Sequence, residues 1–352
     1  MIKLSVIGCG RVAQHYAPFI RELIEEKLIS EVYCVDNNRN QANSFASQFL
    51  KSKVVNFDEL GVSYFPDLSL VLTPSGSHFS NSSNLLELGL NVLVEKPCTL
   101  RLDDAYALKI LADKRELHLG SVHQNRFNPA MVASKELLET QILGSIISVA
   151  VRLRWSRNLE YYLDDWHGRW KSDGGVVSQQ AFHHLDAIHY LLGDVLEIQS
   201  QGTRRRHNLE ADDTSVGFFA LENGALGTFE FTTALTGEDL EASIEILGTG
   251  GVLGVGGVAL NQISILSIPS LSEIKKKEVI NSSQEVPSGY GLGHLPLLRE
   301  TVKRITAGVK NPVIPWEESV RTLQSIHAVY ASQETGLPQR PGPQVQSSRL
   351  GI

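Results

Sequence analysis

Short apolar runs alternate with longer amphipathic stretches over the first 120 residues or so of the chain. The apolar runs are rich in Val, Ile and Leu, as is typical of strands buried on both faces of a parallel sheet. The stretches between them repeat apolar residues every three or four positions, which predicts helices that cover the sheet. We expect strands near 4–7, 31–35, 68–72, 91–94 and 117–122, and helices near 12–27, 38–49, 79–89 and 102–115.

The pattern changes near residue 144, where apolar and polar positions begin to alternate. In 144–155, Val151 and Leu153 share one face of the predicted strand, while Arg152 and Arg154 share the other. Further strands separated by tight turns predict a mostly antiparallel sheet. They are expected at 195–200, 214–221, 225–233, 242–247, 251–259 and 262–267, and the helical period returns at 295–307 and 316–332.

Two domains follow from this pattern. Residues 1–123 are predicted to form an α/β domain, and residues 124–332 an α+β domain with a mostly antiparallel open sheet. The C-terminal helices are expected to return towards the first domain. Residues 333–352 are rich in Gln, Pro, Gly and Ser, which is typical of a loose tail.

Composition and charge exclude several classes of protein. The chain of 352 residues is 42% hydrophobic and 20% charged, which is ordinary for a globular protein. A net charge of −7 argues against nucleic acid or an anionic membrane as the main partner. Three cysteines are too few for a disulfide framework, and no apolar run approaches the ~18 residues that span a bilayer. With no signal-peptide pattern at the N-terminus, we expect a cytoplasmic protein.

A glycine-rich turn follows the first predicted strand and opens a helix. Its sequence, Gly8-Cys9-Gly10-Arg11-Val12-Ala13, fits the G-x-G-x-x-G/A pattern of dinucleotide-binding turns. Gly8 allows the tight turn, and Gly10 lets the backbone approach a pyrophosphate at the helix N-terminus. We therefore predict a Rossmann-type first domain whose cofactor contacts include Gly8, Gly10, Arg11 and Val12.

The next predicted strand ends in an acid, Asp36, roughly 20 residues beyond the turn. An acid at this place binds the ribose hydroxyls and repels a 2′-phosphate, so NAD is favoured over NADP. Asn37 is assigned to the same site. The nearby Arg39 keeps NADP as a less favoured alternative.

One helix of the second domain is predicted to carry a polar face. Gln179, His183, Asp186 and Tyr190 share that face, which holds no Lys, Arg or Glu and therefore resembles the wall of a site. His183 can exchange protons near neutral pH, and Asp186, one turn further, is expected to orient it. A metal bound to these residues and His184 is disfavoured because adjacent histidines diverge on a helix, so no metal is predicted.

Lys96 follows a parallel strand at the carboxyl edge, where open α/β sheets bind ligands. A bound NAD can accept a hydride from a secondary alcohol, and such a reaction requires a base within reach of the hydroxyl proton. A partly desolvated lysine can act as that base or stabilise an oxyanion.

Arginines and tyrosines precede the polar helix and are candidates for substrate binding. Arginine forks match phosphate oxygens, and tyrosine rings stack on sugars or bases. An exposed sheet face explains the same pattern equally well. The candidates are Arg152, Arg154, Arg157, Tyr161 and Tyr162.

Further segments resemble the Gfo/Idh/MocA oxidoreductase family. They are Thr73-Pro74-Ser75 with His78, Glu95-Lys96-Pro97, the run from His123 to Pro129, Gly174-Gly175 with His183 and Asp186, and Ser319–Gly336. The resemblance implies a cis Lys96–Pro97 bond and a homodimer or homotetramer formed through the open sheet. It also implies cofactor contacts from Thr73, Pro74, His78, Glu95, Lys96 and Gln124, and substrate contacts from Asn125 and Arg126.

The chain departs from the family pattern at one position. The family often has Asp four residues before the catalytic His, whereas this chain has Gln179 before His183. An amide at this place is similar to the branch that acts on UDP-N-acetylglucosamine-type sugars. So are Trp166-x-Gly-x-Trp170 and Tyr290-Gly291 with His294. Gln179 and Tyr290 are therefore counted among the site residues.

The motifs together indicate an NAD-dependent oxidoreductase that oxidises a secondary alcohol of a sugar. The resemblance implies a UDP-N-acetylhexosamine or its uronic acid, oxidised at the 3-hydroxyl, with Lys96 and His183 transferring the proton. Three alternatives stay open: a myo-inositol or free-sugar dehydrogenase, an NAD-dependent glycosidase, and a non-catalytic regulator that binds NAD or sugar. The missing carboxylate leaves room for the regulator, whereas Lys96 and His183 argue against it.

Overall fold

The computed structural model describes residues 1–206, 209–286 and 288–352. The chain divides into unit 1, residues 1–122 and 294–320, and unit 2, residues 123–293 and 321–352. The sequence places 294–320 in the second domain, whereas the structure groups this segment with the first. Within the described ranges, none of the helices has both the length and the apolarity that crossing a bilayer requires.

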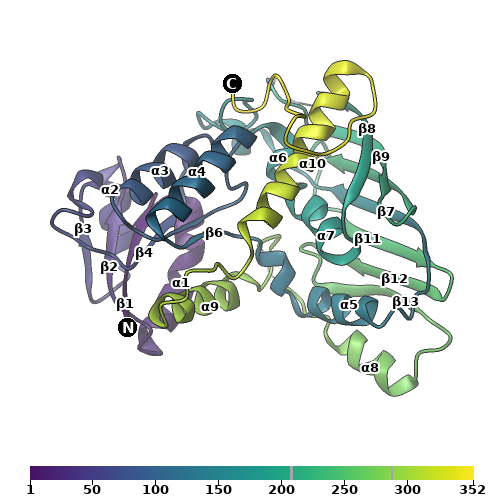
Figure 1. The fold of residues 1–352 in the computed structure, drawn as a ribbon, viewed down its shortest axis with the longest axis horizontal. Coiled ribbons are helices and arrows are strands. Elements are labelled where there is room, and N and C mark those ends of the chain that lie inside the picture. The colour runs from purple at the N-terminus through teal and green to yellow at the C-terminus, as the bar shows by residue number, and fades with distance from the viewer. Residues whose placement is uncertain (207–208, 287) are drawn as a thin grey trace. The chain divides into compact units, whose positions relative to one another are not determined.

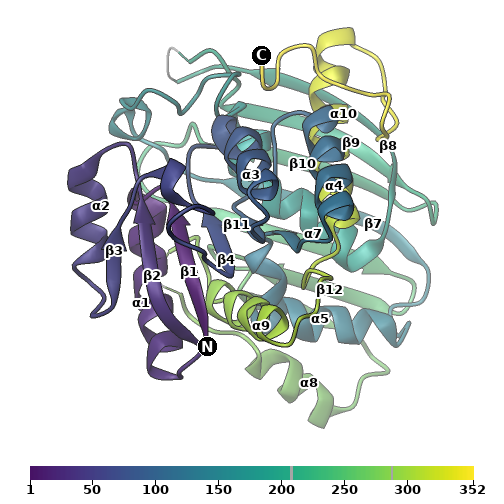
Figure 2. The same cartoon turned by 60° about the vertical axis from the view of Figure 1, so that its left-hand side comes forward.

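Unit 1 contains a six-stranded parallel sheet in the order β3-β2-β1-β4-β5-β6 (Figures 1 and 2). The predicted Rossmann-type α/β domain is confirmed. The short polar edge strand β3 lacks an apolar pattern, and the sequence does not predict it. The elements are β1 (Ile2–Ile7), α1 (Arg11–Glu25), β2 (Ile29–Val35), α2 (Arg39–Ala46), β3 (Ser52–Val54), β4 (Leu68–Val71), α3 (His78–Glu87), β5 (Val92–Val94), α4 (Leu102–Arg115), β6 (Leu119–Ser121) and α9 (His294–Thr306).

Helix α9 joins unit 1 because its apolar stripe packs on α1 and β1. Leu298 and Val302 of that stripe are fully buried. At the rim, the Arg299 guanidinium forms ion pairs with Glu22 at 2.6 Å and Glu26 at 2.7 Å. Burial of the stripe explains why a segment so late in the sequence belongs to the first unit.

Unit 2 contains a seven-stranded sheet in the order β13-β12-β11-β7-β10-β9-β8. Only the β7–β10 pair is parallel, so the predicted mostly antiparallel sheet is confirmed. Helices α6 and α7 pack on one face of it (Figure 1). The elements are α5 (Pro129–Glu139), β7 (Ile146–Arg154), α6 (Gly175–Gln179), α7 (Phe182–Leu192), β8 (Val195–Thr203), β9 (Thr214–Leu221), β10 (Leu226–Thr232), β11 (Glu241–Gly248), β12 (Gly251–Gly256), β13 (Gln262–Ser267) and α8 (Glu273–Asn281), while α10 (Trp316–Thr335) begins in unit 1 and ends in unit 2.

The predicted helix that carries Gln179 and His183 is broken. The Val176 carbonyl accepts hydrogen bonds from both Gln180 N at 3.1 Å and Ala181 N at 2.8 Å. The second of these bonds reaches back five residues, which makes a wide, π-type turn between α6 and α7. Gln179 therefore ends α6 and does not share a helical face with His183, so the prediction of one continuous polar face is wrong.

The segment 333–352 is packed, not loose. The Leu350 side chain is fully buried. The Arg349 guanidinium lies 4.2 Å from the Trp170 ring centre and forms an ion pair with Glu334 at 3.1 Å. The segment is polar in composition, which predicts a loose tail. It is nevertheless held by the buried Leu350 side chain and by the cation–π contact of Arg349 with Trp170.

Candidate functional site

The glycine turn of unit 1 has the geometry that a dinucleotide requires. Gly8 has φ +92°, and a Cβ there would lie 2.9 Å from the Leu72 carbonyl carbon. A Cβ on Gly10 would meet only the Gln41 side-chain oxygen, at 3.8 Å. Gly8 thus lets two strand ends approach, and Gly10 leaves open space at the N-terminus of α1, where Arg11 and Val12 follow. The turn therefore fits a pyrophosphate.

Asp36 at the end of β2 is tied to the same turn. Its carboxylate accepts hydrogen bonds from Cys9 N and Asn38 N, both at 2.7 Å. The acid is half-buried, whereas Asn37 is exposed. Arg39 donates to Asn56 at 3.1 Å. The backbone therefore holds a negative charge where a ribose would lie, which favours NAD over NADP.

The turn after β4 is anchored by the start of α3. Both ring nitrogens of His78 lie within hydrogen-bond distance of backbone carbonyls, Nδ1 at 2.7 Å from Pro97 O and Nε2 at 2.8 Å from Thr73 O. Asn81 Nδ2 donates to Thr73 Oγ1 at 3.0 Å. Thr73 is half-buried and Pro74 exposed, whereas His78 is buried. Thr73 and Pro74 therefore remain candidates for cofactor contact, while the buried His78 ring contacts the Thr73 carbonyl and so holds this turn.

Lys96 follows β5 beside a buried carboxylate. Glu95 accepts hydrogen bonds from Tyr16 Oη at 2.7 Å and from Lys96 N at 3.0 Å, and His294 Nε2 lies 3.7 Å from it. Burial alone would raise the pKa of Glu95, but His294, Tyr16 and Lys96 outweigh it and lower that pKa to about 2. The Lys96–Pro97 peptide bond is cis. The Lys96 backbone is thus held by a buried acid that is ionised at neutral pH.

A second buried carboxylate, Asp186, binds side chains from two other segments of unit 2. Arg126 donates to both of its oxygens, at 2.8 and 2.7 Å, and His123 Nδ1 lies 2.7 Å from Oδ1. Thr322 Oγ1 donates to Oδ1 at 3.1 Å. Burial alone would raise the pKa of Asp186, but Arg126 and His123 hold it well below its usual value. The Arg126 guanidinium neutralises this acid, and its expected contact with substrate stays a prediction.

His183 is oriented by an amide and not by Asp186, which corrects the sequence-based assignment. Its Nε2 lies 3.0 Å from Gln124 Nε2. Gln124 is only 2% exposed, and its expected contact with the cofactor stays a prediction. A Cβ on Gly293 would lie 1.7 Å from the Gln124 carbonyl, so the loop that carries Tyr290 packs directly on this pair. Asn125 is also buried beside it.

The aromatic and arginine candidates separate into two groups. Gln180 Nε2 donates to Tyr161 Oη at 3.1 Å, and the Arg157 guanidinium lies 5.7 Å from the Tyr161 ring. Arg157 also pairs with Asp239 at 3.0 Å. These residues adjoin the end of α6 and therefore remain candidates for substrate binding.

Arg154 belongs to the outer face of the sheet. Its guanidinium pairs with Glu230 at 2.5 Å and Glu241 at 3.2 Å. Neighbouring strands supply the carboxylates that Arg154 pairs with, and its expected contact with substrate stays a prediction. Arg152 pairs with Glu245 at 3.3 Å on the same face.

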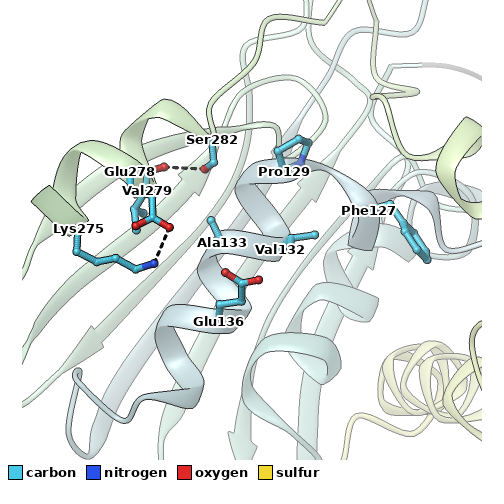
Figure 3. Close-up of a pocket in the computed structure, with 9 residues that line it drawn as sticks. All are labelled: Phe127, Pro129, Val132, Ala133, Glu136, Lys275, Glu278, Val279 and Ser282. Atoms are coloured by element: carbon cyan, nitrogen blue, oxygen red, sulfur yellow. Dashed lines mark hydrogen bonds and ion pairs between the residues drawn. The ribbon is translucent and has the colours of Figure 1, made fainter.

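A hollow of about 390 Å³ lies between α5 and α8 (Figure 3). Val132, Ala133 and Val279 supply its apolar wall, and Lys275 pairs with Glu278 at its edge at 2.8 Å. It contains neither a histidine nor any predicted site residue. We therefore do not assign the reaction to it.

The sequence did not predict the two residues, Tyr16 and His294, that hold Glu95 beside the proposed base Lys96. In the sequence, Tyr16 looks like any other residue on the apolar face of α1. Nothing in the sequence around His294 indicates that it contacts Glu95. Their contacts join segments far apart in the chain, so only the fold reveals them. His184 adjoins His183 but faces the core, where burial lowers its pKa to about 3.

Glu95 should make the protein sensitive to acid. Because its folded-state pKa is about 2, its stabilisation is complete above the ordinary carboxyl pKa of about 4.3 and is lost as pH falls towards 2. The two pKa values correspond to roughly 3 kcal/mol at most. Glu95→Gln should therefore lower the unfolding free energy at neutral pH, by an amount that shrinks in acid, as denaturant titration measures.

Glu116→Gln is the matched control, because Glu116 is an exposed partner of Lys310. An equal loss in the two variants at neutral pH would contradict a special role for Glu95.

Comparisons with known proteins cover nearly the whole chain. The WlbA dehydrogenase of Bordetella pertussis, solved in complex with NADH and UDP-GlcNAcA, is 28% identical, with a TM-score of 0.89 over 96% of this chain and 97% of that one. A glucose-6-phosphate 3-dehydrogenase of Bacillus subtilis is 25% identical over 70% of this chain and 72% of its own length. A scyllo-inositol 2-dehydrogenase (NAD(+)) of the same species is 25% identical over 76% and 77%.

Two family models match consecutive parts of the chain. Residues 2–123 match the NAD-binding Rossmann fold of the oxidoreductase family, and residues 131–254 match the GFO/IDH/MocA C-terminal domain. Both matches agree with the sheets described above. This chain belongs to the Gfo/Idh/MocA family and is an NAD-binding oxidoreductase.

Proposed function

We propose that this protein oxidises the 3-hydroxyl of a UDP-N-acetylhexosamine or its uronic acid. The observation that carries the proposal is the likeness to WlbA along 96% of the chain, at 28% identity, since that enzyme was solved with NADH and UDP-GlcNAcA. The amide Gln179 at the position where the family often has Asp supports the same branch. Relatives named for glucose 6-phosphate and scyllo-inositol make phosphorylated sugars and polyols the competing substrates.

The reaction requires a proton to leave the hydroxyl as the carbonyl forms. Bound NAD supplies the hydride acceptor, and the open space at Gly10 together with the anchored Asp36 fits it. We assign the proton transfer to Lys96 and His183. Glu95 holds the Lys96 backbone, and the Gln124 amide holds the His183 ring, so the Lys96 backbone and the His183 ring are in place before substrate arrives.

Substrate contacts are proposed for the candidates that the fold leaves near His183. Tyr161 and Arg157 adjoin the end of α6, and the loop of Tyr290 packs on Gln124. Tyrosine rings and an arginine fork suit a sugar nucleotide. Asn125 completes this set as a polar group from the segment that also supplies Gln124.

A second copy of the chain is proposed to cover the outer face of the unit 2 sheet. Val216, Phe218 and Leu226 point away from the helices and are 45%, 54% and 64% exposed. Arg154 and its two glutamates lie on the same face and can pair with themselves about a two-fold axis. Such a face is typical of an interface between identical subunits.

Loss of the proton-transfer groups should reduce turnover without preventing cofactor binding. Lys96→Met and His183→Asn should each lower kcat by roughly 10²–10⁴-fold. Lys96→Arg is the matched control for charge, because it keeps the cation but cannot give up a proton. Reduction of NAD would be followed by absorbance with UDP-N-acetylglucosamine, its uronic acid, myo-inositol and glucose.

Reduction with a UDP-sugar alone supports the proposal. Reduction with a free polyol alone would contradict the nucleotide-sugar assignment but keep the chemistry. Near-normal turnover in both Lys96→Met and His183→Asn would contradict the proton-transfer roles.

Asp36 should decide the choice of cofactor. Asp36→Asn keeps the shape but removes the charge, which should raise KM for NAD and shift the NAD/NADP preference by roughly 10–100-fold towards NADP. Asp67→Asn is the control, since Asp67 also accepts a backbone bond, from Lys3 N at 2.7 Å, outside the cofactor turn. An unchanged preference in Asp36→Asn would show that this acid does not face the ribose.

Phe218→Glu should halve the molecular mass in solution, because it places a charge in the proposed interface. Phe65→Glu changes a phenylalanine of similar exposure, 60%, in unit 1 and should leave the mass unchanged. Light scattering after size exclusion measures both. A wild-type monomer would rule the interface out.

A further inference from the structure

His78 connects two backbone segments of unit 1 that are far apart in the sequence. Its Nδ1 and Nε2 lie 2.7 Å from Pro97 O and 2.8 Å from Thr73 O. The residue is 1% exposed, so water hardly competes for the ring. Both partners are carbonyl oxygens, which only accept hydrogen bonds.

Neutral imidazole carries a single N–H, whereas imidazolium carries two. A neutral ring would therefore direct a nitrogen lone pair at one of the two carbonyls and leave that carbonyl unsatisfied, which is costly where water is absent. Both contacts can be hydrogen bonds at the same time only when the ring is protonated.

The charges around His78 oppose one another. Burial lowers the pKa of His78, and the Lys96 ammonium acts in the same direction. The N-terminus of α3, where His78 is the first residue, also disfavours a cation. The ionised Glu95 and the two carbonyls favour the cation. The ring is therefore protonated when both carbonyls lack another hydrogen-bond donor, and neutral when one of them has such a donor.

The two carbonyls differ in their access to water. The contact with Pro97 is buried, whereas the contact with Thr73 is only partly buried, and Pro74 beside it is exposed. A neutral ring therefore keeps its N–H on Pro97 and leaves the Thr73 carbonyl to water.

The turn that carries the Thr73 carbonyl adjoins the phosphate turn. A Cβ on Gly8 would lie 3.0 Å from Thr73 N, so a ligand on the phosphate turn approaches the Thr73 turn as well. We expect a ligand there to reduce the access of water to the Thr73 turn, which makes a Thr73 carbonyl without a donor more costly and favours a second ring N–H.

We propose that His78 is a positioning residue that takes up a proton when NAD binds and thereby locks the Thr73 turn to Pro97, beside Lys96. The proton comes from solvent, and no bond other than N–H is made or broken. The inference rests on cofactor binding, which is part of the proposed function, and not on which sugar is oxidised. Because the complex binds more protons than the free protein, NAD affinity rises as pH falls from about 8 to about 6.

Calorimetric titration of the full chain with NAD, in two buffers of different ionisation enthalpy, measures the proton uptake. The wild type should take up protons. His78→Gln should take up none, bind NAD roughly tenfold more weakly and lose most of the pH dependence of its affinity. Asn81→Ala is the matched control, since Asn81 holds the same turn through a bond that does not titrate. It should weaken binding yet take up as many protons as the wild type.

NMR of wild-type protein labelled with ¹⁵N-histidine provides a readout that needs no variant. One buried histidine should change from one N–H to two when NAD is added. Binding of NAD without proton uptake, equal uptake in His78→Gln, or an unchanged histidine spectrum would each overturn the inference and leave the dehydrogenase proposal intact. Absence of NAD binding would overturn both.

Discussion

The buried carboxylate of Glu95 is the constraint on which the cofactor half of the protein depends. An ionised carboxylate at the end of a buried strand is costly unless it is fully paired. Tyr16 from α1, His294 from α9 and the Lys96 backbone supply those partners. The same contacts therefore attach a late helix to the parallel sheet and hold the peptide of the proposed base in place.

In unit 2, Asp186 is likewise a buried carboxylate that is paired with side chains from distant segments. Arg126 and His123 neutralise this carboxylate, and the helix that carries it also carries His183. The acid does not touch the proposed base. It fixes the segment that contains Gln124, and the Gln124 amide then meets the His183 ring. The charges of Asp186, Arg126 and His123 thus position the segment, and the His183 ring contacts the neutral Gln124 amide.

Several charged residues that suggest substrate binding form ion pairs within the protein. Arg126 and Arg154 are each matched by carboxylates within unit 2. An arginine in a sequence shows that an anion is needed nearby, but not whether the anion is a phosphate or a glutamate on the next strand. The residues proposed for substrate contact, Arg157, Tyr161 and Tyr290, adjoin the π-type turn and the loop on Gln124, although Arg157 also pairs with Asp239.

The sequence alone determined most of the strands and helices, though not β3, α5 or α8, together with the dinucleotide turn and the acid Asp36, because these depend on local periodicity and on glycines within a few residues. It also identified Lys96 and His183 as the reactive pair to test. Only the tertiary structure decided that a wide turn separates Gln179 from His183, that 294–320 joins unit 1, and that Leu350 anchors the C-terminal segment. It also supplied the partners of Glu95, Asp186 and His78. Those contacts connect positions tens to hundreds of residues apart, and a one-dimensional pattern carries no record of which distant side chain satisfies a buried charge.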